Sequence, residues 1–312
     1  MTNRSLIDLE ALSTLFPHRV ANAGDLVALG MPALTVQRRC SANGPWQRLF
    51  PGVVLLSSQP PTRTQLLQGA LCYARGAIVT GHDALALHGI QTVSPDGQIH
   101  LLVPEARFVR GRGKLRVERT STPPKPVLRN RLLIAPLARA AVDAARHMRT
   151  EDEMLAMFSE VVFKHGVRLD ELNTQLIVGG FRGVTPVRRA LHDLGTRIRN
   201  ELAASARSLV HRAGLPPPRW NVPVDDANGN PLGNVTGTWD DVGLAWDVHA
   251  FDFDPAPASY PIALKRGSRL AANGVVVLHT PATFIRTKPD AVIAELRAAH
   301  AHSRPAECVS HA

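Results

Sequence analysis

A short basic stretch near the start of the chain has side chains of the types that recognise nucleic acid. Thr35, Gln37, Arg38 and Arg39 follow one another closely, and Ser41 comes just after them. Arg and Gln side chains can each form two hydrogen bonds with the edge of a base, and hydroxyl groups can donate to phosphate oxygens. The first four residues are therefore candidates for reading bases, and Ser41 is a candidate for contacting the DNA backbone.

The elements predicted around these residues are two short helices and a hairpin. Residues 23–29 favour a helix that ends at Gly30, and Pro32 suits the first turn of a second helix. After the break at Asn43-Gly44-Pro45, residues 46–49 and 53–56 alternate like the two strands of a hairpin. This order is typical of a winged helix-turn-helix, which places a helix in the DNA major groove. Such units also serve as protein contacts, so both interpretations stay open.

Helical spacing divides the residues of the second helix between two faces. The apolar residues Ala33, Leu34, Val36 and Cys40 are expected to form its buried stripe, which leaves the polar residues outward. On the hairpin, Arg48 is expected to reach a phosphate.

A second basic segment lies farther along the chain. Residues 101–150 hold twelve Lys or Arg and three acidic residues, whereas residues 225–254 hold seven Asp and no Lys or Arg. The glycine-containing basic loop and the start of the strand after it are expected to grip the DNA backbone through Arg107, Arg110, Arg112, Lys114 and Arg116. Docking of an acidic partner and a merely solvated turn are the alternatives. The loop has no Gly-Lys-Ser/Thr sequence, so it matches no nucleotide-binding loop.

Composition limits the class of protein. The net charge is +10 and the isoelectric point about 10.5, which favours a polyanionic partner. The three cysteines show no metal or disulfide spacing, and no long apolar segment is present. We therefore expect a cytoplasmic, nucleoid-associated protein without membrane association.

The pattern of elements predicts an α+β multidomain chain. We expect a winged helix-turn-helix over residues 1–58, a basic α/β middle domain over 59–194, a C-terminal α/β domain over 195–304 and a tail over 305–312. Separate helices are predicted at 186–194 and 196–213. Strands are predicted at 99–103 and 114–119 on either side of the basic loop.

The acidic region offers a possible metal site. Asp247 and His249 are two residues apart on a predicted strand and so share one face. A solvated acidic edge is the alternative. His82 and His88 are six residues apart, which does not place them on one helical face, so they are expected to pack or cap.

The N-terminal half resembles a known family. The phrases WQRLFPGVVLL, PPTRTQLLQGALCYARGAIVTGHDALALHGI, LLVPEARFVRGRGKLRVERT and PLARAAVDAA occur in the order seen in AbiEi-type antitoxins and regulators. The resemblance covers about residues 5–150. It implies a winged helix joined to a basic domain, DNA binding at the protein's own promoter, and action beside a nucleotidyltransferase toxin.

Residues 195–300 resemble the DUF559/Vsr-like domain of restriction-endonuclease-like fold. The phrases are RIRNELAASARSLVHRAGLPPPRWNVPV, LGNVTGTWDDVGLAWDVHAF and RLAANGVVVLHTPATFIR. In a nuclease of this fold, carboxylates hold a divalent metal that activates water. Glu201 matches the helical Glu, Thr236 stands where the family has Asp, and Asp247-Val248-His249 stands where it has Glu-Val-Asp. The resemblance thus implies a degenerate site in which Thr236 and His249 stand in place of two carboxylates and Asp247 is shorter than the family's Glu.

These observations lead to one main expectation and one alternative. The main expectation is a sequence-specific DNA-binding transcriptional regulator of the AbiEi antitoxin type, binding double-stranded DNA without a cofactor, with a possible toxin partner and a possible homodimer. The alternative is a metal-dependent DNA endonuclease using Mg²⁺ or Mn²⁺, with Glu201, Asp247 and His249 as its catalytic residues.

Overall fold

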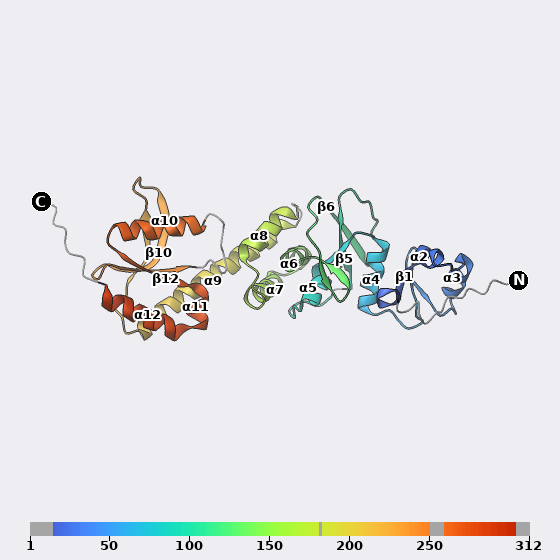
Figure 1. Cartoon of the computed structure of the whole chain (residues 1–312), viewed down its shortest axis with the longest axis horizontal. Helices are drawn as coiled ribbons and strands as arrows, with labels where there is room; N and C mark the ends of the chain where they lie inside the picture. Colours follow the sequence, from blue (N-terminus) through green and yellow to red (C-terminus); the bar gives the residue numbers. More distant parts are fainter. Residues whose placement is uncertain (1–14, 96, 181–182, 250–258, 304–312) are drawn as a thin grey trace. The chain divides into compact units, whose positions relative to one another are not determined.

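The computed structural model describes residues 15–95, 97–180, 183–249 and 259–303 of the chain (Figure 1). The chain divides into two compact units. The first comprises residues 1–161 and 175–187, and the second comprises residues 162–174 and 188–312. The described residues form a mixed helix and strand structure with three sheets, which agrees with the predicted α+β class.

The first unit begins with a small three-stranded sheet and two short helices. Its strand order is β1-β3-β2, and all pairs are antiparallel. Gly30 adopts a φ of 95° after the first helix, as the sequence predicts, and Pro32 directly precedes the second helix rather than lying in its first turn. The elements are η1 (Pro17–Arg19), β1 (Val20–Asn22), α2 (Ala23–Ala28), α3 (Ala33–Arg39), β2 (Gln47–Phe50) and β3 (Val53–Leu55).

The small sheet is covered on both faces. On one face, Leu26 and Val36 from the two helices pack with Trp46 and Val54. On the other face, Val53 and Leu55 belong to a separate cluster that includes Cys72 and Tyr73 at the end of the next helix. This small sheet is therefore held between α2 and α3 on one side and the following helix on the other.

The first unit also contains a five-stranded mixed sheet with its helices. Its order is β6-β5-β4-β8-β7, and β5 pairs with β6 in parallel. The predicted strands at 99–103 and 114–119 are thus confirmed as partners, and the basic loop crosses back between their ends. The elements are α4 (Arg63–Tyr73), β4 (Ile78–Thr80), α5 (Gly81–His88), β5 (Ile99–Pro104), β6 (Leu115–Thr120), β7 (Val127–Arg129), β8 (Leu132–Ile134) and α6 (Leu137–Ala145).

Three helices follow, and the last differs from the prediction. They are α7 (Glu151–Phe163), α8 (Leu169–Val178) and α9 (Val184–Arg212). The predicted break between residues 194 and 196 is wrong, because α9 continues through Gly195. Leu191, Leu194 and Ile198 are all buried, so one apolar stripe spans the glycine and offsets its cost of about 1 kcal/mol in a helix.

The second unit contains a four-stranded sheet. Its order is β12-β11-β10-β9, with β11 and β12 parallel and the other pairs antiparallel. The core includes Trp239, Trp246 and Leu296. The elements after α9 are β9 (Arg219–Asp225), β10 (Pro231–Trp239), β11 (Leu244–His249), α10 (Ser259–Ala272), β12 (Val276–Pro281), α11 (Ala282–Thr287) and α12 (Pro289–His302).

No helix in the described part of the chain is long and apolar enough to cross a membrane.

Candidate nucleic-acid interface

Helix α3 presents part of its predicted polar set to solvent. Gln37, Arg38 and Ser41 are exposed, and the Ser41 hydroxyl donates to the Arg38 carbonyl over 2.8 Å. Neither Gln37 nor Arg38 has an acidic partner among the residues that the structure describes. Their hydrogen-bonding groups are therefore available to a ligand.

Other residues of α3 depart from the predicted division. Leu34 is 57% exposed, although the sequence places it in the buried stripe, and Ala33 is also exposed. Thr35 is half-buried. Val36 and Cys40, four residues apart, face the sheet, so at 100° per residue Leu34 turns outward beside Arg38. The exposed face of α3 thus contains an apolar side chain among the polar ones.

Arg39 is held against the protein. Its guanidinium carbon lies 5.0 Å from the centre of the buried Trp46 ring, and this cation–π contact contributes on the order of 0.5–1 kcal/mol. Gly44 makes the turn between them possible, because a Cβ atom there would lie 2.1 Å from the Arg39 carbonyl oxygen. Arg39 is half-buried in this position, so Arg38 is the better placed of the two for reading a base.

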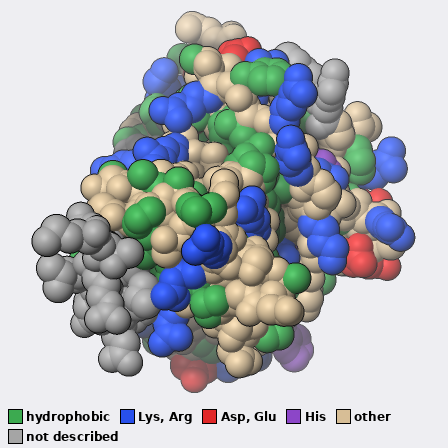
Figure 2. Space-filling view, turned by 90° about the vertical axis from the view of Figure 1, so that its right-hand side faces the viewer, with side chains coloured by type: hydrophobic (Ala, Val, Ile, Leu, Met, Phe, Trp, Pro, Cys, Tyr) green, Lys and Arg blue, Asp and Glu red, His purple; other side chains and the backbone are tan. Residues whose placement is uncertain are grey.

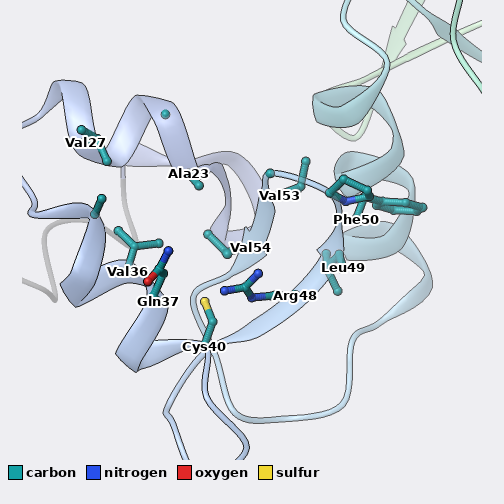
Figure 3. Close-up of a pocket in the computed structure, with 14 residues that line it drawn as sticks. Ala23, Val27, Val36, Gln37, Cys40, Arg48, Leu49, Phe50, Val53 and Val54 are labelled. Carbon is teal, nitrogen blue, oxygen red and sulfur yellow. The ribbon is translucent and has the colours of Figure 1, made fainter.

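Arg48 lies on β2 beside a hollow between α2, α3 and the hairpin (Figure 3). It is exposed, and its side chain points towards Gln37 and Cys40. Burial raises the pKa of the Cys40 thiol, and the nearby Arg48 charge opposes this effect. The hairpin thus brings a predicted phosphate contact next to a predicted base contact.

The basic loop is exposed, as expected, but its residues are not all free. Arg107 donates to the Arg75 carbonyl over 2.5 Å, and Tyr73 donates to the Arg110 carbonyl over 3.3 Å. Phe108 is 76% exposed, with the Arg110 guanidinium 6.0 Å from its ring centre. Arg112 and Lys114 are also exposed. The loop is therefore anchored through Arg107 and leaves three cations on its surface.

Arg116 differs from the loop cations because it faces inward. It is half-buried on β6 and pairs in register with the buried His100 of β5. Its charge lies close enough to His147 to disfavour protonation of that ring. The prediction that Arg116 contacts the DNA backbone is therefore not supported by its place in the fold.

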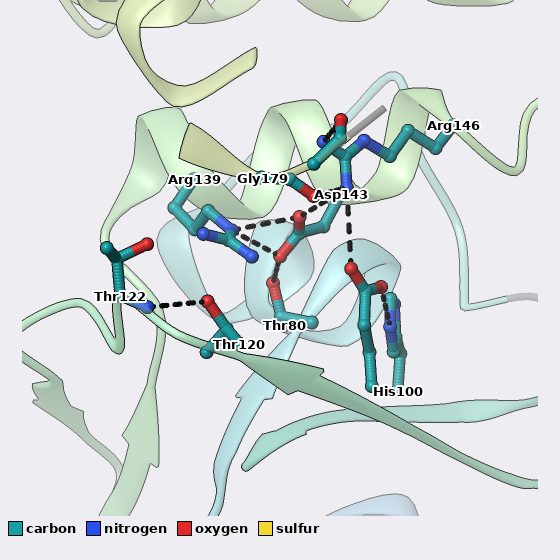
Figure 4. Close-up of polar contacts among 10 residues, drawn as sticks. Thr80, His100, Thr120, Thr122, Arg139, Asp143, Arg146 and Gly179 are labelled. Atoms are coloured by element: carbon teal, nitrogen blue, oxygen red, sulfur yellow. Dashed lines mark hydrogen bonds and ion pairs between the residues drawn. The ribbon is translucent and has the colours of Figure 1, made fainter. Parts of the chain in front are cut away.

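Arg116 belongs to a polar face for which no prediction was made from the sequence. Figure 4 shows part of this face. Strands β4, β5 and β6 contribute Thr80, His100 and Glu118 to this face, where α6 and the residues after it supply a matching polar stripe. The stripe consists of Arg139, Asp143, Arg146 and His147. We call these seven residues together with Arg116 the polar face.

At the centre of the polar face, Asp143 is fully buried. It accepts hydrogen bonds from Arg139 over 2.9 Å and from Thr80 over 2.7 Å. Burial raises the pKa of Asp143, against the opposing effects of Arg139 and Thr80. Arg139 is 1% exposed, and its two terminal nitrogens have no partner in the structure. Arg139 and Asp143 both belong to α6, so this buried charge pair lies within the helix, and the hydrogen bond from Thr80 of β4 joins α6 to the sheet.

At the edge of the polar face, three side chains could hold a metal ion. Donor atoms of His100, Glu118 and His147 all lie within 4.8 Å of one another. Burial favours the neutral form of Glu118, but His100 and Arg146 outweigh it, so its pKa is lowered. Burial and the Arg116 charge lower the pKa of His147 to about 4. The same arginines that repel a proton here also repel a cation, so the cluster is better explained as packing.

The sequence carries a signal for the polar face. The segment LARAAVDAARHM places charged or polar residues at 139, 143, 146 and 147, one side of an otherwise apolar helix. His100 and Glu118 lie on neighbouring strands and contact each other through their side chains, and only the parallel pairing of β5 and β6 brings them together.

In the second unit, Asp247 is bound by an arginine. Asp247 is 2% exposed, and Arg266 of α10 donates to its Oδ2 from Nη2 over 2.7 Å and from Nε over 3.2 Å. The His279 Nδ1 atom lies 3.9 Å from the same oxygen. The hydroxyl of Thr236 accepts from the Val248 amide over 2.9 Å. The predicted positions 236 and 247 therefore come together on neighbouring strands, and Arg266 is bonded to the Asp247 carboxylate.

The other predicted catalytic residues do not join this group. Glu201 is exposed on α9 and is not part of any potential metal-binding group in the described chain. His249 ends β11, and its side chain lies outside the described residues. His82 is half-buried, and the half-buried His88 shares a hydrogen bond of 2.9 Å with the Ala135 carbonyl.

Comparison with known proteins gives limited information. No family model matches the chain, and no curated protein is significantly similar to it. Among solved structures, the chain is similar to the Rv2827c protein of Mycobacterium tuberculosis, at 16% identity and a TM-score of 0.44, over 60% of this chain and 75% of that chain. A similarity of this size does not establish a shared fold.

Proposed function

We propose that the protein is a sequence-specific DNA-binding transcriptional regulator of the AbiEi antitoxin type. The observation that carries the proposal is the exposed face of α3, where Gln37 and Arg38 are unpaired among the described residues and lie beside a short hairpin. A helix followed by such a hairpin suits the DNA major groove. Arg38 and Gln37 would read bases, and Leu34 would contact an apolar base group.

The surface charge supports the proposal. Figure 2 shows Lys and Arg side chains spread across the face seen from the side of α2 and α3, with acidic side chains mainly near its margins. On the first unit, Arg110, Arg112 and Lys114 are exposed on the basic loop and are proposed to hold phosphates. Cations on phosphates supply sequence-independent affinity that falls as salt rises.

The second unit is proposed to serve as a scaffold or partner surface. Its order of helix and strands, α9-β9-β10-β11-α10-β12, suits the restriction-endonuclease-like fold that the sequence resembles. The ion pair between Asp247 and Arg266 uses the carboxylate that a nuclease would offer to a metal. A nucleotidyltransferase toxin and a second copy of the chain remain proposed partners.

Binding to DNA tests the proposed function. The full chain is mixed with its own upstream DNA and with scrambled DNA, at two salt concentrations, with and without Mg²⁺ or Mn²⁺. We expect a preference for the upstream DNA that persists at the higher salt, without cleavage. Equal affinity for both DNAs at both salt concentrations would overturn the proposal, and metal-dependent cuts lost in Asp247→Ala would establish the endonuclease alternative.

Variants locate the reading helix within that assay. Arg38→Ala should lower the affinity for the upstream DNA by about 1–3 kcal/mol and leave binding to scrambled DNA nearly unchanged. Arg39→Ala serves as the matched variant, since its guanidinium is held on Trp46. A larger loss of specificity in Arg39→Ala than in Arg38→Ala would show that the base-reading assignment is wrong.

A further inference from the structure

The hollow between α2, α3 and the hairpin has the size of a small-molecule site. It encloses about 600 Å³, within the range of roughly 300–1,000 Å³ that ligand pockets occupy. Its walls come from three elements whose positions the apolar core fixes, since Val36 and Val54 are 5% and 4% exposed. The walls are therefore preformed rather than dependent on a ligand.

The lining of this hollow is apolar with a single polar end. Val27, Val36, Leu49 and Val54 are among its apolar walls. The polar side chains Gln37, Cys40 and Arg48 point towards one another (Figure 3). An apolar site with a few convergent polar groups is the usual composition of a ligand pocket.

The polar end determines the charge of the ligand. The cationic side chain that lines the hollow is Arg48, and it has no acidic partner among the residues that the structure describes. A guanidinium group binds a carboxylate through two parallel hydrogen bonds, and the Gln37 amide can donate a further one. A phosphodiester bound to Arg48 would leave the apolar walls of the hollow without a partner, so the lining favours a ligand that also has an apolar part.

We propose that this hollow binds a small amphipathic monocarboxylate, with its apolar body between α2 and α3 and its carboxylate on Arg48. Binding itself does not depend on the proposed function. One consequence rests on that function: because Gln37 and Arg48 would then be shared, an occupied hollow weakens binding of the chain to DNA.

The test uses the full chain without DNA. Decanoate and the uncharged 1-decanol are titrated separately into the protein by isothermal calorimetry. We expect decanoate to bind more tightly than decanol, and Arg48→Met to weaken decanoate on the order of tenfold while leaving decanol unchanged. Arg129→Met, which removes an exposed cation on β7 outside the hollow, is the control and should stay within about twofold.

Filling the hollow with a large side chain provides a second, independent test. Val27→Trp from α2 and Ala33→Phe from α3 each place an aromatic ring in it at an exposed position, and thermal unfolding shows whether each variant is folded. Any folded filling variant should lose binding of both probes. The absence of decanoate binding to the unaltered chain, equal affinity for decanoate and decanol, or equal losses in Arg48→Met and Arg129→Met would each overturn the proposal.

Discussion

Helices α3 and α6 of the first unit carry arginines that differ in exposure and in pairing. On α3, Arg38 projects into solvent with no acidic partner in the described structure, whereas on α6, Arg139 is 1% exposed and paired with the buried Asp143. Both count equally in the net charge of +10. Exposure separates a cation that can bind a ligand from one that is paired inside the fold, and a count of charges in the sequence does not.

A third arginine extends this comparison to the second unit. Arg266 is mostly buried against Asp247, so it resembles Arg139 rather than Arg38. Removing the partner of a buried carboxylate lowers the free energy of unfolding strongly, whereas removing the partner of a solvated carboxylate does not. Stability and binding measurements can therefore distinguish these positions.

The largest effect is expected at Asp143. Asp143→Ala leaves the Arg139 charge buried and without a carboxylate, which should lower the free energy of unfolding by about 3–5 kcal/mol. Urea unfolding followed by circular dichroism measures it. Asp290→Ala, which removes an 88% exposed partner of Arg212, is the control and should cost less than about 1 kcal/mol. Similar losses of unfolding free energy in both variants would contradict the argument that the buried ion pair matters more for stability than the exposed one.

Arg266→Met should also be strongly destabilising. It removes the arginine that donates to the buried Asp247 carboxylate, and we expect a loss of about 3 kcal/mol in the free energy of unfolding of the second unit. Tryptophan fluorescence follows this unit because Trp220, Trp239 and Trp246 lie in it. A stable Arg266→Met variant that acquires Mg²⁺-dependent DNA cleavage would instead show that Arg266 masks a working metal site.

The basic loop should show a smaller and salt-dependent effect. Arg110→Ala and Arg112→Ala should each weaken DNA binding equally for upstream and scrambled sequences, and reduce the slope of log affinity against log salt by about 1. Fluorescence anisotropy over a salt series measures both quantities. Arg146→Ala removes a cation that is bonded to Glu118 and Gly179 within the polar face, so an unchanged slope is expected there.

The smallest effect concerns pH. The pKa of His147 is about 4 in the folded chain and about 6.5 unfolded, so between these values the unfolded state binds the proton more readily. Stability is therefore full above pH 6.5 and falls as the pH drops towards 4. Because His147 is exposed, the change in the free energy of unfolding over this pH range should be modest. His147→Gln should flatten this part of the stability profile, and an NMR titration midpoint near 6.5 for His147 would contradict the argument.

Much of the fold could be predicted from local patterns. Gly30 and Pro32 mark the ends of α2 and α3, and the alternation around Pro51-Gly52 marks the hairpin. The short strands β1, β4, β7 and β8 were not predicted because three residues carry too little periodicity, whereas β3, equally short, was predicted from the turn at Pro51-Gly52. The continuity of α9 through Gly195 was missed because burial outweighs the low helix propensity of glycine.

The candidate site was predicted only in part, because the sequence does not fix which way a side chain points or which residue it pairs with. Spacing placed Gln37 and Arg38 on the outside of α3 but misplaced Leu34, since the exact rotation of a two-turn helix depends on what packs beneath it. The resemblance matched Thr236 and Asp247 to two positions of one family site, yet only the fold shows that Arg266 reaches the Asp247 carboxylate.

The sequence by itself determined the local features of this protein: its helices with marked ends, its hairpin, its basic loop and its charge. Those follow from interactions between residues close together in the chain. Tertiary structure alone decided which charges are buried, because partners such as Thr80 and Asp143, or Asp247 and Arg266, lie 63 and 19 residues apart. Whether a cation can bind a ligand or is paired inside the protein depends on burial, which is a property of the whole fold.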